Sequence, residues 1–136
     1  MNRVLDAHAL MAYLEKEPGY ITVRDLFVEA SDQGIRLLMS AVNYGEVYYS
    51  VLRECGPRVT EDIEKTIRAL PIEIVDADTA LAREAGRFKV KYKISYADCF
   101  AAALAKQNRA ELVTGDPEFA GLGADIEILW LKVNES

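Results

Sequence analysis

Short β-like runs alternate along the chain with segments of helical periodicity, and this alternation restricts the fold more than any other feature. The β-like runs occupy residues 3–5, 36–39, 72–75, 111–114 and 126–131. The helical patterns occupy residues 7–15, 21–31, 41–54, 60–70, 79–88 and 95–108. Such alternation is typical of an α/β fold built on a mainly parallel sheet, and this is the fold class that we predict.

Glycine, proline and small hydroxyl residues mark where the predicted helices begin and end. Gly56 and Pro57 are expected to break the helix that starts after Ser40. We expect Thr60 to be the N-cap of the next helix and Ser95 to be that of the last one. The 136 residues contain no internal repeat and no linker rich in Gly, Ser or Pro. We therefore expect a single domain over residues 1–136.

Charge and composition exclude several classes of protein. The net charge of −6 argues against a general histone-like binder of nucleic acids, and no apolar stretch is long enough to span a bilayer. The first residues lack the apolar core of a signal peptide. Cys55 and Cys99 lack metal-ligand spacing and suit reduced thiols in the cytoplasm, which is the localisation that we expect. Because His8 is the one histidine, most histidine-based chemistry is excluded.

Carboxylates recur where the predicted segments leave one edge of the sheet. Asp6 and Asp116 each follow a strand, Asp98 lies in the first turn of a helix, and Glu46 lies early in the helix after the second strand. Ligands of open parallel sheets bind beyond the carboxyl ends of the strands. Each acid alone could be a helix cap or a solvated residue. Capping does not explain why acids recur at this edge rather than Ser, Thr or Asn. Clustered carboxylates repel one another, and a hard divalent cation relieves that repulsion.

Four short motifs contain these acids, and together they resemble the ordered motifs of PIN domains. The motifs are Val4-Leu5-Asp6, Asn43-Tyr44-Gly45-Glu46, Ser95-Tyr96-Ala97-Asp98 and Leu112-Val113-Thr114-Gly115-Asp116. The short chain is similar to the VapC-type toxins of toxin–antitoxin pairs. The resemblance implies a three-layer α/β/α sandwich with a five-stranded mainly parallel sheet. It also implies Mg²⁺- or Mn²⁺-dependent cleavage of single-stranded or structured RNA.

The resemblance carries catalytic and metal-binding roles over to four acids, which are Asp6, Glu46, Asp98 and Asp116. Thr114 matches a supporting position of the family, and Glu118 matches its accessory acid. We assign Asp6 and Asp116 as direct metal ligands. The other two acids would bind the metal directly or through water. A hard metal polarises the phosphate and lowers the pKa of a bound water, so hydrolysis would leave a 5′-phosphate and a 3′-hydroxyl.

An acidic protein needs local positive charge to hold RNA, and residues 83–93 carry such charge. Their net charge is +4, which leaves −10 for the rest of the chain. Lys89, Lys91 and Lys93 shortly precede Asp98 and are the predicted phosphate contacts, with an ordinary solvated connection as the alternative. His8 stands where the family usually has a small hydroxyl or amide residue. We expect it near the pocket, as a further residue that touches RNA phosphate.

The resemblance also implies protein partners, namely a cognate antitoxin and a second copy in a homodimer, whereas no membrane partner is expected. Tyr44, Tyr48, Val51 and Leu52 repeat at helical spacing. Such a stripe is normally core, and partial exposure would indicate a partner surface. One alternative is a non-catalytic PIN-like module that binds RNA or protein. Another is a phosphoacceptor signalling domain, which needs paired acids after the first strand, where this chain has only Asp6.

Overall fold

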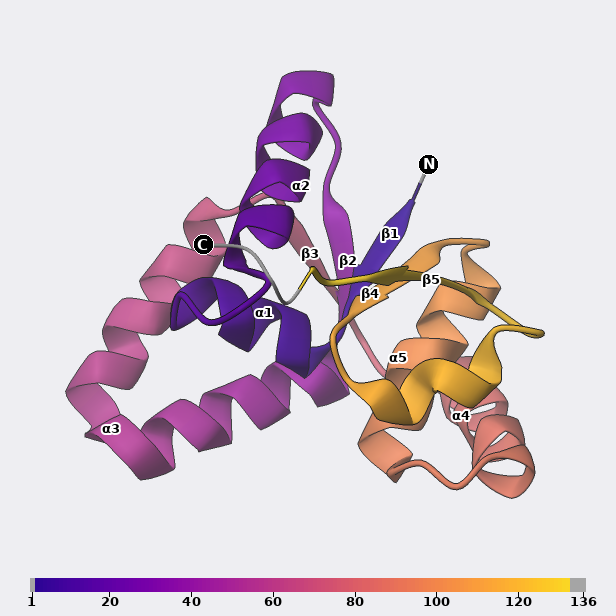
Figure 1. Cartoon of the computed structure of the whole chain (residues 1–136). Helices are drawn as coiled ribbons and strands as arrows, with labels where there is room; N and C mark the ends of the chain where they lie inside the picture. Colours follow the sequence, from indigo (N-terminus) through magenta and orange to yellow (C-terminus); the bar gives the residue numbers. More distant parts are fainter. Residues whose placement is uncertain (1, 133–136) are drawn as a thin grey trace.

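One sheet of five parallel strands lies at the centre of the structure (Figure 1). The computed structural model describes residues 2–132, so residue 1 and residues 133–136 of the expected domain lie outside the described part. The strands are β1 (Arg3–Leu5), β2 (Leu37–Ser40), β3 (Ile72–Val75), β4 (Glu111–Thr114) and β5 (Glu127–Trp130). Their order across the sheet is β3-β2-β1-β4-β5. Each of these neighbours pairs in parallel, with Val4 opposite both Leu38 and Leu112. The predicted five-stranded parallel sheet is confirmed.

Helices cover both faces of this sheet. They are α1 (Ala7–Leu14), α2 (Tyr20–Gln33), α3 (Ala41–Ala69), α4 (Thr79–Lys91), α5 (Tyr96–Gln107) and the 3₁₀ helix η1 (Pro117–Leu122). Helices α1, α2 and α3 lie on one side of the sheet, and α4 and α5 lie on the other (Figure 1).

Successive residues of the central strands point to opposite faces, as the pleat of a strand requires. Val4 of β1 and Leu112 of β4 pack in one core with α4 and α5. Their neighbours Leu5 and Val113 pack in a second core with α1, α2 and α3. The strands are apolar on both faces because both faces are covered. The sheet is therefore the middle layer of an α/β/α sandwich, as the resemblance implied.

Helix α3 bends sharply at Gly56, which separates two helical arms (Figure 1). Gly56 has φ 83° and ψ 175°, a conformation that glycine adopts far more readily than other residues. Pro57 begins the second arm, where its missing N–H would have had no helical partner. The predicted break is confirmed, but the predicted N-cap at Thr60 is wrong. Because the helix restarts at Pro57, Thr60 lies inside the second arm, and its hydroxyl donates to the Gly56 carbonyl over 2.8 Å.

Two helix starts and one helix end bear on the predicted site. The Ser40 and Ser95 hydroxyls cap α3 and α5, accepting from the N–H groups of Val42 and Asp98, so the predicted cap at Ser95 is confirmed. Helix α4 continues to Lys91, beyond the predicted end at residue 88. Cations in a last helical turn are favoured by the helix dipole, and α4 ends with such residues.

Within residues 2–132, no helix combines the length and the apolar character that a membrane crossing would require.

Candidate metal centre

The carboxyl ends of the central strands and the first turns of the following helices bring acids to one edge of the sheet. Asp6 follows β1 directly and is the N-cap of α1. Asp116 follows β4 and is the N-cap of η1. Asp98 lies in the first turn of α5, and Glu46 lies in the second turn of α3.

Three of the acids form a compact cluster. Asp98, Asp116 and Glu118 each offer one carboxylate oxygen, and these oxygens all lie within 4.8 Å of one another. Ligand oxygens that share one Mg²⁺ or Ca²⁺ ion at about 2.0–2.6 Å can be roughly 4–5 Å apart, so the spacing suits a common cation. Glu118 is exposed and the two aspartates are half-buried, which leaves the cluster open on one side.

Asp6 lies beside this cluster but is buried, with 2% of its surface exposed. Its Oδ1 accepts from the N–H of Ala9 over 2.8 Å, and its Oδ2 accepts from the hydroxyl of Thr114. The Thr114 oxygen in turn accepts from the N–H of Asp116 over 3.0 Å. One hydroxyl therefore links the buried acid to the backbone of a member of the cluster.

Glu46 is held by Asn43, a residue for which the sequence predicted no role. The Asn43 side-chain amide donates to Glu46 Oε1 over 2.9 Å and to the Ala97 carbonyl over 3.1 Å. Asn43 is fully buried, and its own Oδ1 has no hydrogen-bond partner among the described residues. The amide thus joins α3 to the start of α5, next to Asp98. The spacing of Asn43 and Glu46, three residues apart on one helix, was the available sign of this contact.

Burial and mutual repulsion raise the pKa of two of the acids. Burial raises the pKa of Asp6 to about 7, helped by the charges of Asp98 and Asp116, although the bonds from Thr114 and Ala9 act in the opposite direction. Burial likewise raises the pKa of Asp98 to about 6.

The charges that act on Asp98 connect the cluster to Glu46. Asp116, Glu46 and Glu118 all contribute to the raised pKa of Asp98, in that order of size. The ordered motifs therefore converge in space, and the five acids form one strongly negative site. The charges that most affect Asp6 and Asp98 among residues 2–132 are all negative, and a divalent cation would compensate them.

Helix capping and clustering are compatible at this edge. Asp6 and Asp116 do cap helices, accepting from the N–H groups of Ala9 and Glu118, as the alternative interpretation proposed. Each of these carboxylates still has lone pairs free for a metal, because an ionised carboxylate accepts about four bonds. The cluster found among the described residues consists of carboxylate oxygens and includes no histidine or cysteine. Such a donor set fits Mg²⁺ or Mn²⁺ better than zinc.

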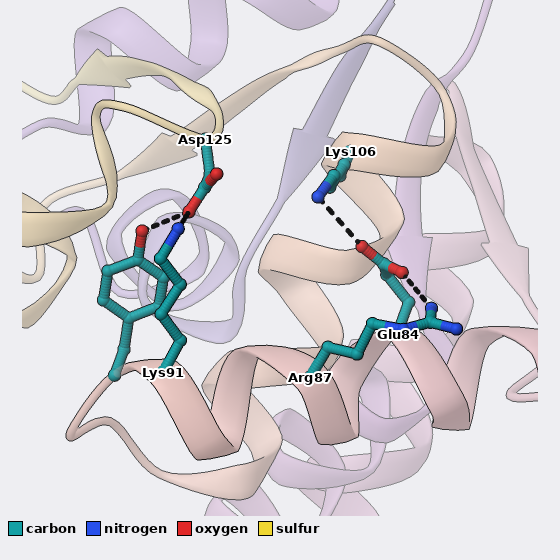
Figure 2. Close-up of polar contacts among 6 residues, drawn as sticks. Glu84, Arg87, Lys91, Lys106 and Asp125 are labelled. Atoms are coloured by element: carbon teal, nitrogen blue, oxygen red, sulfur yellow. Dashed lines mark hydrogen bonds and ion pairs between the residues drawn. The ribbon is translucent and has the colours of Figure 1, made fainter.

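The predicted phosphate-binding lysines have unequal surroundings. Lys91 forms an ion pair of 2.9 Å with Asp125 (Figure 2), and the hydroxyl of Tyr92 donates to the same carboxylate. Lys89 donates to the carbonyl of Ile94 over 2.7 Å. Lys93 is exposed, and it has no hydrogen bond or ion pair within the described part of the chain.

One acid lies within residues 83–93 and is already counted in their net charge of +4. Glu84 lies between Arg87 and Lys106, at 2.5 Å and 3.3 Å, as Figure 2 shows. These hydrogen bonds and charges outweigh burial and lower the pKa of Glu84 below its usual range. Most of the basic segment is therefore the end of α4, with one ion pair, between Glu84 and Arg87, inside it. Its lysines are exposed, and their contact with RNA phosphate stays a prediction.

His8 is exposed, two residues after Asp6. The end of its imidazole ring lies against Gly115, the residue before Asp116. The structure thus places His8 at the rim of the acidic site.

Comparison with known proteins identifies the family. The model of the PIN domain matches residues 3–124. The chain belongs to the PIN domain family. No curated protein matches it at a significant level. This PIN domain is similar in fold to VapBC from Salmonella typhimurium, solved bound to DNA, with 18% identity and a TM-score of 0.76, over 95% of this chain and 97% of that one.

Two further solved structures share the fold. FitAcB from Neisseria gonorrhoeae is 17% identical, with a TM-score of 0.71 over 93% of this chain and 96% of that one. Mycobacterium tuberculosis VapC20, described as a sarcin–ricin loop cleaving toxin, is 15% identical, with a TM-score of 0.71 over 90% of this chain and 95% of that one. The predicted resemblance to PIN domains is confirmed. At these identities, the likeness to individual toxins is a likeness of fold.

Proposed function

We propose that this PIN domain is a metal-dependent ribonuclease. The observation that carries the proposal is the compact cluster of Asp98, Asp116 and Glu118 beside the buried Asp6. A structural role does not require so much uncompensated negative charge at one place, since burial and repulsion make that charge unfavourable. Functional sites are where such perturbed groups gather.

The clustered acids Asp98, Asp116 and Glu118 would hold Mg²⁺ or Mn²⁺. Asp6, which the sequence predicts to be a direct ligand, lies outside this cluster, so Asp6 and Glu46 would bind the metal directly or through water. When bound, the metal polarises the phosphodiester and lowers the pKa of a bound water. Two of these carboxylates already accept hydrogen bonds that orient them, Asp6 from Thr114 and Glu46 from Asn43. Such supporting hydrogen bonds fix ligand orientation in metal sites. Hydrolysis would leave a 5′-phosphate and a 3′-hydroxyl.

Cleavage is tested with purified protein and a labelled RNA. We expect cleavage in Mg²⁺ or Mn²⁺ and none in EDTA. Asp98→Asn and Asp116→Asn should abolish cleavage, whereas the control Asp32→Asn, at an exposed acid of α2, should cleave like the wild type. Equal cleavage in EDTA would contradict the proposal. Metal binding without cleavage of any RNA would favour the non-catalytic RNA- or protein-binding module.

The proposal extends to a toxin with an antitoxin partner. Structural neighbours include VapBC and a toxin–antitoxin complex from Klebsiella pneumoniae. A groove of about 450 Å³ lies between α1 and the two arms of α3, lined by Met11, Leu14, Glu15, Val51, Glu54, Cys55, Val59 and Ile63. On the first arm Tyr48 and Leu52 are partly exposed, at 38% and 37%, whereas Tyr44 packs against the core. This apolar surface suits an amphipathic segment of an antitoxin.

The partner is tested by co-expressing the protein with the product of the adjacent reading frame. Val59→Glu places a charge in the groove and should prevent co-purification. Val28→Glu is the matched control, because Val28 is an exposed valine of α2 that does not line the groove. Both variants should still cleave RNA. Light scattering on the free protein would test the predicted homodimer.

A further inference from the structure

The contact between His8 and Gly115 is the least expected feature of the acidic site. A Cβ atom built on Gly115 would lie 2.6 Å from His8 Cε1, closer than real Cβ atoms come to other atoms, and 3.1 Å from Nδ1, tighter than most real contacts. The backbone does not require glycine here, because the described glycines with positive φ are Gly19, Gly34 and Gly56. A side chain at position 115 would therefore require the imidazole ring to move from the place that it occupies.

The position of this ring relates it to the proposed reaction. His8 follows Asp6 by two residues, and Gly115 precedes Asp116 by one, so the ring bridges the two segments that carry candidate ligands. His8 is nevertheless exposed. Its imidazole makes no hydrogen bond or ion pair with the other residues of the described range 2–132. An imidazole always carries at least one N–H donor, and this donor is free.

Two other side-chain donors at the site, on Thr114 and Asn43, are already occupied. The Thr114 hydroxyl donates to Asp6, and the Asn43 amide donates to Glu46 and to the Ala97 carbonyl. A phosphodiester that approaches five carboxylates needs donors beyond the metal, since its own charge is negative. A free N–H at the rim of the site meets that need.

We propose that His8 contacts the RNA by donating a hydrogen bond to a phosphate oxygen next to the metal centre, and that glycine at position 115 gives the imidazole the space to do so. This inference rests on the proposed ribonuclease function. It assigns His8 the role of a substrate-contacting residue, which requires neither a change of its protonation nor a bond to the metal.

The test compares the wild type with His8→Ala, His8→Gln, Gly115→Ala and the double variant His8→Ala/Gly115→Ala. RNA affinity is measured by fluorescence anisotropy in Ca²⁺, which binds the same kind of oxygen ligands. A lost hydrogen bond to a charged group corresponds to roughly a tenfold or larger loss of affinity, and this is expected for His8→Ala. His8→Gln keeps an N–H donor and should retain most of the affinity.

Gly115→Ala tests the space argument. Its methyl group should displace the ring and reduce RNA affinity as His8→Ala does. The double variant should be no worse than His8→Ala alone, because two changes that remove one interaction are not additive. A Gly115→Ala protein that folds poorly, with folding restored in the double variant, would equally support the contact. A Gly115→Ala protein with wild-type affinity would overturn it.

Two further measurements separate this inference from other roles and from the proposed function. His8→Ala should raise KM for RNA cleavage more than it lowers kcat, and the Mn²⁺-induced rise in melting temperature should equal that of the wild type. Loss of the Mn²⁺ response would make His8 a metal ligand and overturn the inference. Unchanged RNA affinity in His8→Ala, with active wild type, would overturn the inference alone. A wild type without cleavage would overturn the proposed function, and the RNA affinities would still decide the role of His8.

Discussion

The Thr114 hydroxyl donates a hydrogen bond to Asp6 Oδ2 across the neighbouring strands β1 and β4. Both side chains are buried, and the Thr114 oxygen also accepts from the N–H of Asp116. A carboxylate in such surroundings depends on its hydrogen bonds, because burial alone favours the neutral acid. The contact therefore fixes Asp6 relative to the loop that carries Asp116, and it counteracts the rise in the pKa of Asp6.

Replacing Thr114 by Val keeps the side-chain shape and removes this donor. We expect the free energy of unfolding at pH 7 to fall by about 1–3 kcal/mol, because a buried acceptor loses its partner. The Mn²⁺-induced rise in melting temperature should also decrease. Thr114→Ser retains the hydroxyl and should lie closer to the wild type in both measurements. Urea unfolding and metal titrations measure the two effects. If the Val variant and the wild type do not differ in either, Thr114 does not hold Asp6 in place.

Asp98→Asn should separate a metal ligand from a helix cap. The pKa of Asp98 is raised to about 6 in the folded protein, so its protonation favours folding. The stabilisation that comes from this proton is fully present below the unfolded pKa of about 3.9, and it is lost as the pH rises through 6. At pH 7 without metal, the ionised group is therefore unfavourable. The Asn variant should melt at or above the wild-type temperature, as measured by calorimetry in EDTA.

The same variant should lose most of its stabilisation by Mn²⁺. A ligand that binds only the folded state stabilises it more the more tightly it binds, and the variant lacks one of the ligands. The control Asp32→Asn should respond to Mn²⁺ as the wild type does. A clear loss of stability in EDTA together with an intact metal response would make Asp98 structural and remove it from the site.

The strands and the edge of the sheet could be predicted because they depend on local pattern. β1, β3 and β4 begin and end where their apolar runs do, and parallel strands bring their carboxyl ends together whatever the details of packing. Contacts between distant elements could not be predicted. Lys91 meets Asp125 only because the segment before β5 returns over α4, and His8 meets Gly115 only because α1 starts beside the end of β4. Neither approach leaves a periodic signal in the sequence.

Metal binding should depend on pH. The folded-state pKa is about 7 for Asp6 and about 6 for Asp98, and ligands must lose their protons before they bind a metal. Protons therefore compete with the metal below these values. We expect the Mn²⁺-induced rise in melting temperature to be small at pH 5 and to increase up to about pH 8. The same rise at both ends of this range would show that neither carboxyl loses a proton on binding.

Asn43→Ala removes the amide that joins Glu46 to the start of α5. The free energy of unfolding should fall by about 1–3 kcal/mol, because the partly buried Ala97 carbonyl loses its donor. The Mn²⁺ response should weaken because Glu46 is no longer held in place. Asn108→Ala is the matched control. Its amide donates to the Leu104 carbonyl at the other end of α5, so this variant should lose stability without losing the metal response. Equal metal responses in the two variants would exclude a positioning role for Asn43.

Lys89, Lys91 and Lys93, at the end of α4 and just after it, should contribute unequally to RNA binding. Lys93 is exposed, whereas Lys91 is paired with Asp125 and Lys89 with a carbonyl. Lys93→Ala should therefore weaken RNA binding and reduce the slope of log affinity against log salt by roughly 0.7, the value for one phosphate contact with a single strand. Replacing all three lysines by Ala should add little to this loss, and metal affinity should not change. Lys65→Ala, at an exposed lysine on the second arm of α3, is the control. Anisotropy titrations at several salt concentrations measure the affinity and the slope. The same affinity and slope for Lys93→Ala as for the control would mean that Lys93 does not bind RNA.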